Sequence, residues 1–97
     1  MPKGYIMAQV DIHDPHAYAE YRAQSPASVA EFGGKFLVRG GHMEPVEGDP
    51  PLPRIVVIEF PSLEQAKVWY GSPGYQAIIA VRQNASTGQL FLVEGAD

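Results

Sequence analysis

The stretch RIVVIEFPSLEQ, Arg54 to Gln65, carries the clearest strand and helix signals in the chain. Its first seven residues predict a strand, because β-branched and aromatic side chains are enriched in strands. Pro61 ends that strand, and Ser62 begins the S-x-x-Q spacing of a helix capping box. We expect the helix to run to about Tyr70, before Gly71-Ser72-Pro73 stops it and starts another helix.

The chain before this stretch predicts a strand, a helix and a second strand. Tyr5 to Ile12 is rich in strand-forming residues, and Asp14-Pro15 after it is typical of a helix N-cap followed by proline. Pro26 disfavours helical geometry at its neighbour, so we expect a kink there or two short helices. Gly33 suits the left-handed conformation that closes a helix. A strand is expected over Lys35 to Glu44.

The remaining segments complete a regular order of elements. PVEGDPPLP, residues 45–53, has four prolines and is predicted to be a surface loop. A helix is expected from Pro73, with Tyr75 and Arg82 on one face, and a last strand over Leu90 to Glu94. The order βαββαβ predicts a ferredoxin-like α+β fold, a four-stranded antiparallel sheet with both helical segments on one face.

The strand at the centre of this prediction is apolar on both sides. Ile55 and Val57 alternate with Val56, Ile58 and Phe60, whereas a sheet with one face in water alternates apolar with polar residues. The chain has no spare element to cover the second face. A second copy of the same sheet is the economical cover, so we expect a homodimer with the two sheets face to face.

Length and composition exclude several classes of function. A chain of 97 residues supports one domain. The net charge is −4 with scattered basic residues, which argues against nucleic acid and anionic membranes as partners. The chain has no cysteine, and its only close histidine pair, His13 and His16, straddles a helix start. We therefore expect no metal and no cofactor, and a cytoplasmic location is the default because no apolar run is long enough to span a membrane.

Several blocks together resemble one family. DPHAYAEY, GGKFLVRGG, Glu47-Gly48, IEFPSLEQAKVWYGSPGYQ and Arg82 look like the DUF1330 family, over Tyr5 to Gly95. The resemblance implies a single DUF1330-like domain, residues 1–97, of the dimeric α+β-barrel class. Members of that wider class include cofactor-free oxygenases, isomerases and haem-handling proteins, but the resemblance implies no particular reaction.

Three polar residues are candidates for chemistry. Arg39 is predicted to lie in the second strand, on the side opposite Phe36, where its guanidinium suits either Glu59 of the next strand or the acid group of a ligand. Glu59 interrupts an apolar strand and needs a polar partner, or acts as a general base. His42 is either an exposed strand-end residue or a proton shuttle at a pocket mouth. Gly40 and Gly41 after Arg39 permit a bulge, or a close approach of another backbone or a ligand.

The aromatic residues of the helical segments are the other candidates. Polar-tipped rings either fill the core or line a cleft, and this applies to Tyr18, Tyr21, Trp69, Tyr70 and Tyr75. Two functions stay open. One is binding or transforming a small, anionic organic molecule in a pocket between helices and sheet. The other is a non-catalytic dimeric module for structure or interaction.

Overall fold

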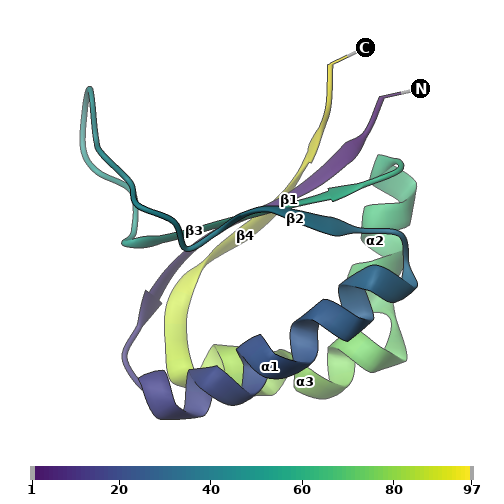
Figure 1. The fold of residues 1–97 in the computed structure, drawn as a ribbon, viewed down its shortest axis with the longest axis horizontal. Coiled ribbons are helices and arrows are strands. Elements are labelled where there is room, and N and C mark those ends of the chain that lie inside the picture. The colour runs from purple at the N-terminus through teal and green to yellow at the C-terminus, as the bar shows by residue number, and fades with distance from the viewer. Residues whose placement is uncertain (1, 97) are drawn as a thin grey trace.

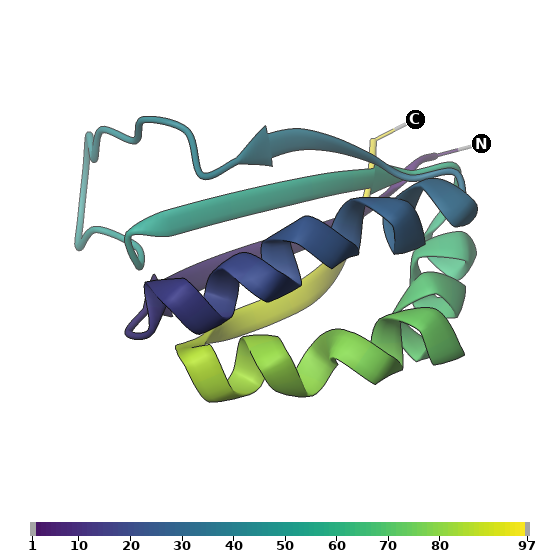
Figure 2. The ribbon, with the colours of Figure 1, turned by 60° about the horizontal axis from the view of Figure 1, so that its bottom comes forward.

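The computed structural model describes residues 2–96 as one antiparallel sheet with three helices on one of its faces (Figures 1 and 2). The sheet order is β2-β3-β1-β4, and all three pairings are antiparallel. This confirms the predicted ferredoxin-like α+β fold. The elements are β1 (Gly4–Ile12), α1 (Pro15–Glu31), β2 (Lys35–Arg39), β3 (Arg54–Phe60), α2 (Leu63–Gly71), α3 (Pro73–Ala85) and β4 (Ser86–Glu94).

The helices begin at the caps that the sequence predicted. The Asp14 carboxylate accepts a hydrogen bond from the backbone N–H of Ala17 at 3.1 Å. The Ser62 hydroxyl accepts from the N–H of the third residue after it at 3.1 Å, as a capping box requires. Ser72 caps α3 in the same way, and Pro73 occupies the first helical position.

The core lies between the helices and the inward face of β1 and β3. Ile6, Ile58 and Phe60 are buried there, and Trp69 of α2 and Tyr75 of α3 are fully buried against them. The Trp69 and Tyr75 rings lie 4.1 Å apart between centroids. Both rings therefore belong to the hydrophobic core.

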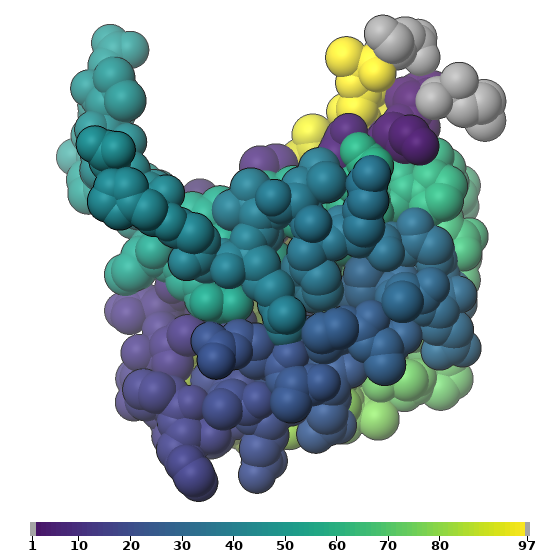
Figure 3. Space-filling view, in the orientation of Figure 1, coloured from purple at the N-terminus to yellow at the C-terminus, as the bar shows by residue number. Residues whose placement is uncertain are grey.

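Two strand boundaries differ from the sequence prediction. β2 ends at Arg39 rather than Glu44, because Gly40 takes a φ of +71°, which no strand residue adopts. β4 begins at Ser86, directly after α3, rather than at Leu90. The long segment 40–53 consequently stands away from the body of the molecule, on the side of the sheet that carries no helix (Figures 1 and 3).

Pro26 does not divide α1 into two short helices, one of the two outcomes that the sequence predicted. The helix runs continuously from Pro15 to Glu31 with Pro26 inside it. Proline lacks the N–H that would donate to the carbonyl oxygen four residues earlier, which is that of Arg22. The guanidinium of Arg39 donates to this carbonyl instead, through Nη2. A side chain from the sheet thus replaces the hydrogen bond that the helix loses.

A bulge in β2 decides which face Arg39 occupies. Phe36 pairs with Ile58, but Val38 pairs with Val57, so Leu37 is an extra residue in the ladder. After this insertion Arg39 pairs with Val56, whose side chain faces the helices. The predicted position of Arg39, opposite Phe36, is therefore wrong, because one inserted residue reverses the alternation of faces.

Candidate functional site

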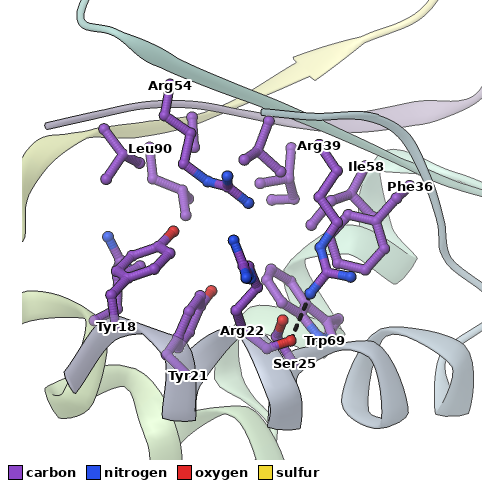
Figure 4. Close-up of a pocket in the computed structure, with 15 residues that line it drawn as sticks. Tyr18, Tyr21, Arg22, Ser25, Phe36, Arg39, Arg54, Ile58, Trp69 and Leu90 are labelled. Carbon is purple, nitrogen blue, oxygen red and sulfur yellow. Dashed lines mark hydrogen bonds between the residues drawn. The ribbon is translucent and has the colours of Figure 1, made fainter. Parts of the chain in front are cut away.

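A small cavity lies between the sheet and the helices α1 and α3 (Figure 4). Its volume is about 30 Å³, room for about two water molecules. Apolar residues of the sheet form one wall, and tyrosine and arginine side chains form the rest. The lining residues are Ile6, Ala8, Val10, Tyr18, Tyr21, Arg22, Ser25, Phe36, Arg39, Arg54, Val56, Ile58, Trp69, Arg82 and Leu90.

Arg39 reaches the cavity from the edge strand β2. Its guanidinium lies over the Phe36 ring, 4.5 Å from the centroid, and donates to the Arg22 carbonyl freed by Pro26. A guanidinium stacked on an aromatic ring and hydrogen-bonded at one nitrogen has its direction fixed. Its positive charge stays available, because neither partner carries a negative charge.

Arg54 reaches the same cavity from β3 and lies against Gly40. A Cβ atom at Gly40 would overlap Nη1 of Arg54, so only glycine leaves room for this guanidinium. On its other side, Arg54 lies over the Tyr18 ring, 5.6 Å from the centroid. The glycine after Arg39 therefore serves the close approach of an arginine from the neighbouring strand.

Two further arginines, Arg22 of α1 and Arg82 of α3, complete a group of four cations. The lining contains no acidic side chain, and none of the four takes part in an ion pair found within residues 2–96. In the same part of the chain, the Nε atoms of Arg54 and Arg82 are buried without a hydrogen-bond partner. Buried cationic donors are normally paired, so this concentration of unpaired positive charge makes the cavity the candidate site for an anion.

Two tyrosine hydroxyls meet beside the arginines. The hydroxyls of Tyr21 and Tyr75 lie 2.8 Å apart and form a hydrogen bond in which either is the donor. Burial raises the pKa of Tyr21 well above its usual value, and the nearby Tyr75 raises it further. Burial likewise raises the pKa of Tyr75, although Tyr21 and Arg82 act to lower it. Both phenols are therefore neutral donors at physiological pH.

The structure brings together four of the six residues predicted to bind a ligand. Tyr18, Tyr21, Arg39 and Trp69 line the cavity, and Figure 4 shows the Tyr18 and Tyr21 hydroxyls directed toward the arginine side chains. The other two, Tyr70 and Tyr75, lie outside the lining. Tyr70 lines a second groove beside β4, whereas Tyr75 is buried behind the lining, where its hydroxyl meets that of Tyr21 and its ring packs on Trp69.

Glu59 and His42, the other candidates for chemistry, lie elsewhere. Glu59 is on the opposite face of the sheet, where it accepts a hydrogen bond from the Tyr5 hydroxyl at 3.1 Å and pairs with Lys35 at 3.6 Å. The Tyr5 hydrogen bond raises the pKa of that phenol. His42 is exposed and pairs with Glu44 at 3.4 Å. Of the two partners considered for Arg39, Glu59 is therefore excluded within residues 2–96.

Three arginines of the site were not predicted, although the sequence contained partial signals. Arg54 shares the alternation of Val56, Ile58 and Phe60, the core-facing residues of its strand. Arg82 shares a helical face with Tyr75. Arg22 had no signal of its own, because its convergence with the others depends on how α1 packs across the sheet.

The described residues give no sign of a metal site or a membrane span. Within residues 2–96 there is no cluster of three or more histidine, aspartate or glutamate side chains able to hold a metal ion. None of the helices described is both long enough and apolar enough to cross a membrane.

The fold and the cavity place this chain among small ferredoxin-like α+β proteins, and comparisons identify the family. The profile of the family described as "Domain of unknown function (DUF1330)" matches residues 3–96. The chain belongs to this family. A search of curated proteins found no match.

Solved structures with the same fold include RPA0582 from Rhodopseudomonas palustris, described as a protein of unknown function. That structure is 20% identical with a TM-score of 0.72, and the match covers 99% of this chain and 84% of that one. A methylated form of RPA0582 gives 19% identity, a TM-score of 0.75 and coverages of 99% and 82%. SnoaB, a cofactor-independent oxygenase from Streptomyces nogalater, is 16% identical, with a TM-score of 0.65 and coverages of 100% and 96%. At these identities the likeness shows the fold alone.

Proposed function

We propose that the protein binds or transforms a small organic anion in the arginine-lined cavity. The observation that carries this proposal is the convergence of four arginines on a space whose lining has no acidic side chain. The protein as a whole is acidic, with a net charge of −4. Positive charge gathered in one cavity of an acidic protein favours a negatively charged ligand.

The walls of the cavity suit an organic anion rather than a bare inorganic one. Ile6, Val56 and Ile58 give one side an apolar surface, and Phe36 and Tyr18 add aromatic faces. Small-molecule sites typically combine such walls with a few well-placed polar groups. The carbon skeleton would lie against the sheet, while the guanidiniums hold the acidic group.

The same geometry favours chemistry in which negative charge develops on the bound molecule. Arginines and neutral phenol donors fixed in a space partly shielded from water stabilise a developing enolate or alkoxide more strongly than water does. SnoaB, which shares the fold, is described as a cofactor-independent oxygenase. Reactions of that kind are compatible with a site built from these residues, and we propose no particular substrate from this likeness.

A library of small carboxylic acids, followed by thermal unfolding, tests the binding proposal. A ligand that binds the folded protein raises the melting temperature, and Arg39→Met should abolish that rise. Lys67→Met is the matched control, because it removes one positive charge from an exposed ion pair with Glu64 on α2. If the library raises the melting temperature equally in the wild type and in Arg39→Met, the cavity is not the binding site.

We also propose that the open face of the sheet forms a homodimer. Val38, Phe91 and Val93 on this face are about two-fifths exposed, and Met7 and Val57 lie between them. Monomeric proteins seldom expose a contiguous apolar patch of this kind. A second copy would bury it in an interface on the order of 800 Å² per partner.

Sedimentation tests the dimer. A species of 10.6 kDa at micromolar concentration would contradict it, whereas Val57→Lys should convert a dimer to monomers. The non-catalytic alternative predicts the same dimer but no ligand response, so the two functions are separated by the carboxylic acid library and not by the oligomeric state.

A further inference from the structure

We infer that the ligand of the cavity is a short dicarboxylate, with two acid groups held by two different guanidiniums. This inference rests on the proposed binding of a small organic anion and specifies its charge and size. Three observations carry it: the contacts that orient the Arg39 and Arg54 guanidiniums, the additional positive charges of Arg22 and Arg82, and the volume of the cavity.

The two strand arginines are fixed by separate supports. Arg39 is stacked on Phe36 and bonded to the helix carbonyl that lacks its intrahelical partner. Arg54 is held between the Gly40 backbone and the Tyr18 ring. None of these contacts neutralises the positive charge, so each of the two guanidiniums can bind one carboxylate through two parallel hydrogen bonds.

The two forks are directed differently, which favours two carboxylates over one doubly charged group. In Figure 4 the Arg54 guanidinium points from the sheet into the middle of the cavity, whereas that of Arg39 is turned toward α1 at one side. The guanidinium of Arg22 lies between them. A phosphate presents all its oxygens around one atom, whereas a dicarboxylate presents two planar groups that can meet two planar forks.

The remaining positive charge also requires more than one negative charge. Arg22 and Arg82 face the same space, and Nε of Arg82, like that of Arg54, is buried without a partner in residues 2–96. A single carboxylate would leave three of these four arginines without a counter-charge in a region partly shielded from water. A dianion reduces their mutual repulsion further, so it should bind more tightly than a monoanion with the same carbon skeleton.

The volume of the cavity limits the length of the ligand. A cavity of about 30 Å³ admits a carboxylate but no large body unless side chains move. The Arg22 side chain is exposed, so it can swing outward on its long stem, while Trp69 and the apolar residues of the sheet cannot move in this way. When Tyr75 is the donor in its hydrogen bond to Tyr21, the hydroxyl proton of Tyr21 is left to donate to a ligand oxygen.

Calorimetric titration at constant ionic strength tests this inference. Succinate and butyrate have the same number of carbons, as do malonate and propionate, so each pair differs only by the second carboxylate. We expect the dicarboxylates to bind at least tenfold more tightly than their partners. Arg54→Met should reduce succinate to the affinity of butyrate, and Lys67→Met should leave the preference unchanged. If Arg54→Met does not fold, Arg22→Met replaces it, because the Arg22 side chain lines the same cavity but is exposed.

The possible outcomes separate the inference from the function on which it rests. If butyrate and succinate bind equally, and both depend on Arg39, the small-anion function stands and the dicarboxylate inference is wrong. If inorganic phosphate binds more tightly than every dicarboxylate, the two-fork geometry is wrong. If no anion binds the folded protein, both the inference and the proposed function fail.

Discussion

Replacing Gly40 with alanine should separate binding from stability, because this glycine has two distinct roles. Its φ of +71° lies in the left-handed region, where a side chain costs about 1 to 2 kcal/mol. Its N–H donates to the Ile55 carbonyl at 2.8 Å, so the backbone is held in place. The added Cβ would also overlap the Arg54 guanidinium, which must then move from its position in the cavity.

The expected loss in the free energy of unfolding follows from these contacts. Arg54 ends in a flexible side chain, so its displacement costs little beyond its interaction with the Tyr18 ring, about 0.5 to 1 kcal/mol. Gly40→Ala should therefore lower the free energy of unfolding by about 1.5 to 3 kcal/mol. In a domain of this size, each kcal/mol lowers the melting temperature by roughly 4 to 8 °C. Affinity for a small dicarboxylate should fall at least tenfold, because one of its two forks is lost.

Gly48→Ala is the matched control. Gly48 has nearly the same φ, +74°, but a Cβ there has nothing within 4 Å. This variant should lose at most about 1 to 2 kcal/mol and keep the affinity of the wild type. Urea denaturation measures the first quantity and calorimetric titration the second. If Gly40→Ala binds as tightly as Gly48→Ala, the position of Arg54 against Gly40 does not matter for binding and the reasoning is refuted.

Three other substitutions test the supports of the site. Arg39→Met should change the free energy of unfolding by about 1 kcal/mol or less in urea denaturation, because its partner is an exposed carbonyl and not a buried carboxylate; a loss of 3 to 5 kcal/mol would indicate a buried ion pair instead. Pro26→Ala restores the helical donor to the Arg22 carbonyl, so it should raise that free energy by about 1 to 3 kcal/mol while weakening anion binding; no gain in stability would mean that the proline is already accommodated. The pKa of Tyr21, which faces Tyr75 and Arg82, is raised in the folded protein, so the unfolded chain loses this phenol proton at a lower pH than the folded protein does. The contribution of Tyr21 to the free energy of unfolding is therefore fully present below pH 10 and falls above that pH by about 1.4 kcal/mol per pH unit. Tyr21→Phe should show a shallower alkaline decline in urea titrations from pH 9 to 11, and an unchanged slope would contradict the pKa shift.

Much of the fold could be predicted from local signals. The caps at Asp14, Ser62 and Ser72 depend on a side chain and the backbone within three residues, so their chemistry is visible in the sequence. Alternating apolar residues in β1 and β3 likewise identify the strands and the core face. The aromatic residues could be placed on the helices, but not divided between core and cavity.

The composition of the site depended on the tertiary structure. The bulge at Leu37 moves Arg39 to the helical face, and no local pattern marks which residue of a strand is inserted. Pro26 removes the backbone hydrogen bond to the Arg22 carbonyl, and Arg39 donates to that carbonyl instead. A proline that predicts a break in the helix thus helps to position an arginine of the site. Such effects join residues far apart in the chain, and their geometry exists only after the helices pack on the sheet.

The sequence by itself determined the order of elements, the helix caps and the presence of glycines where the chain needs positive φ. Only the tertiary structure decided that Arg54 lies against Gly40, and that Arg22, Arg39 and Arg82 face the same cavity. The physical reason is the separation along the sequence over which each kind of interaction acts. Caps and alternation act over two to four residues, whereas the convergence of charges depends on packing between elements that are separated along the chain.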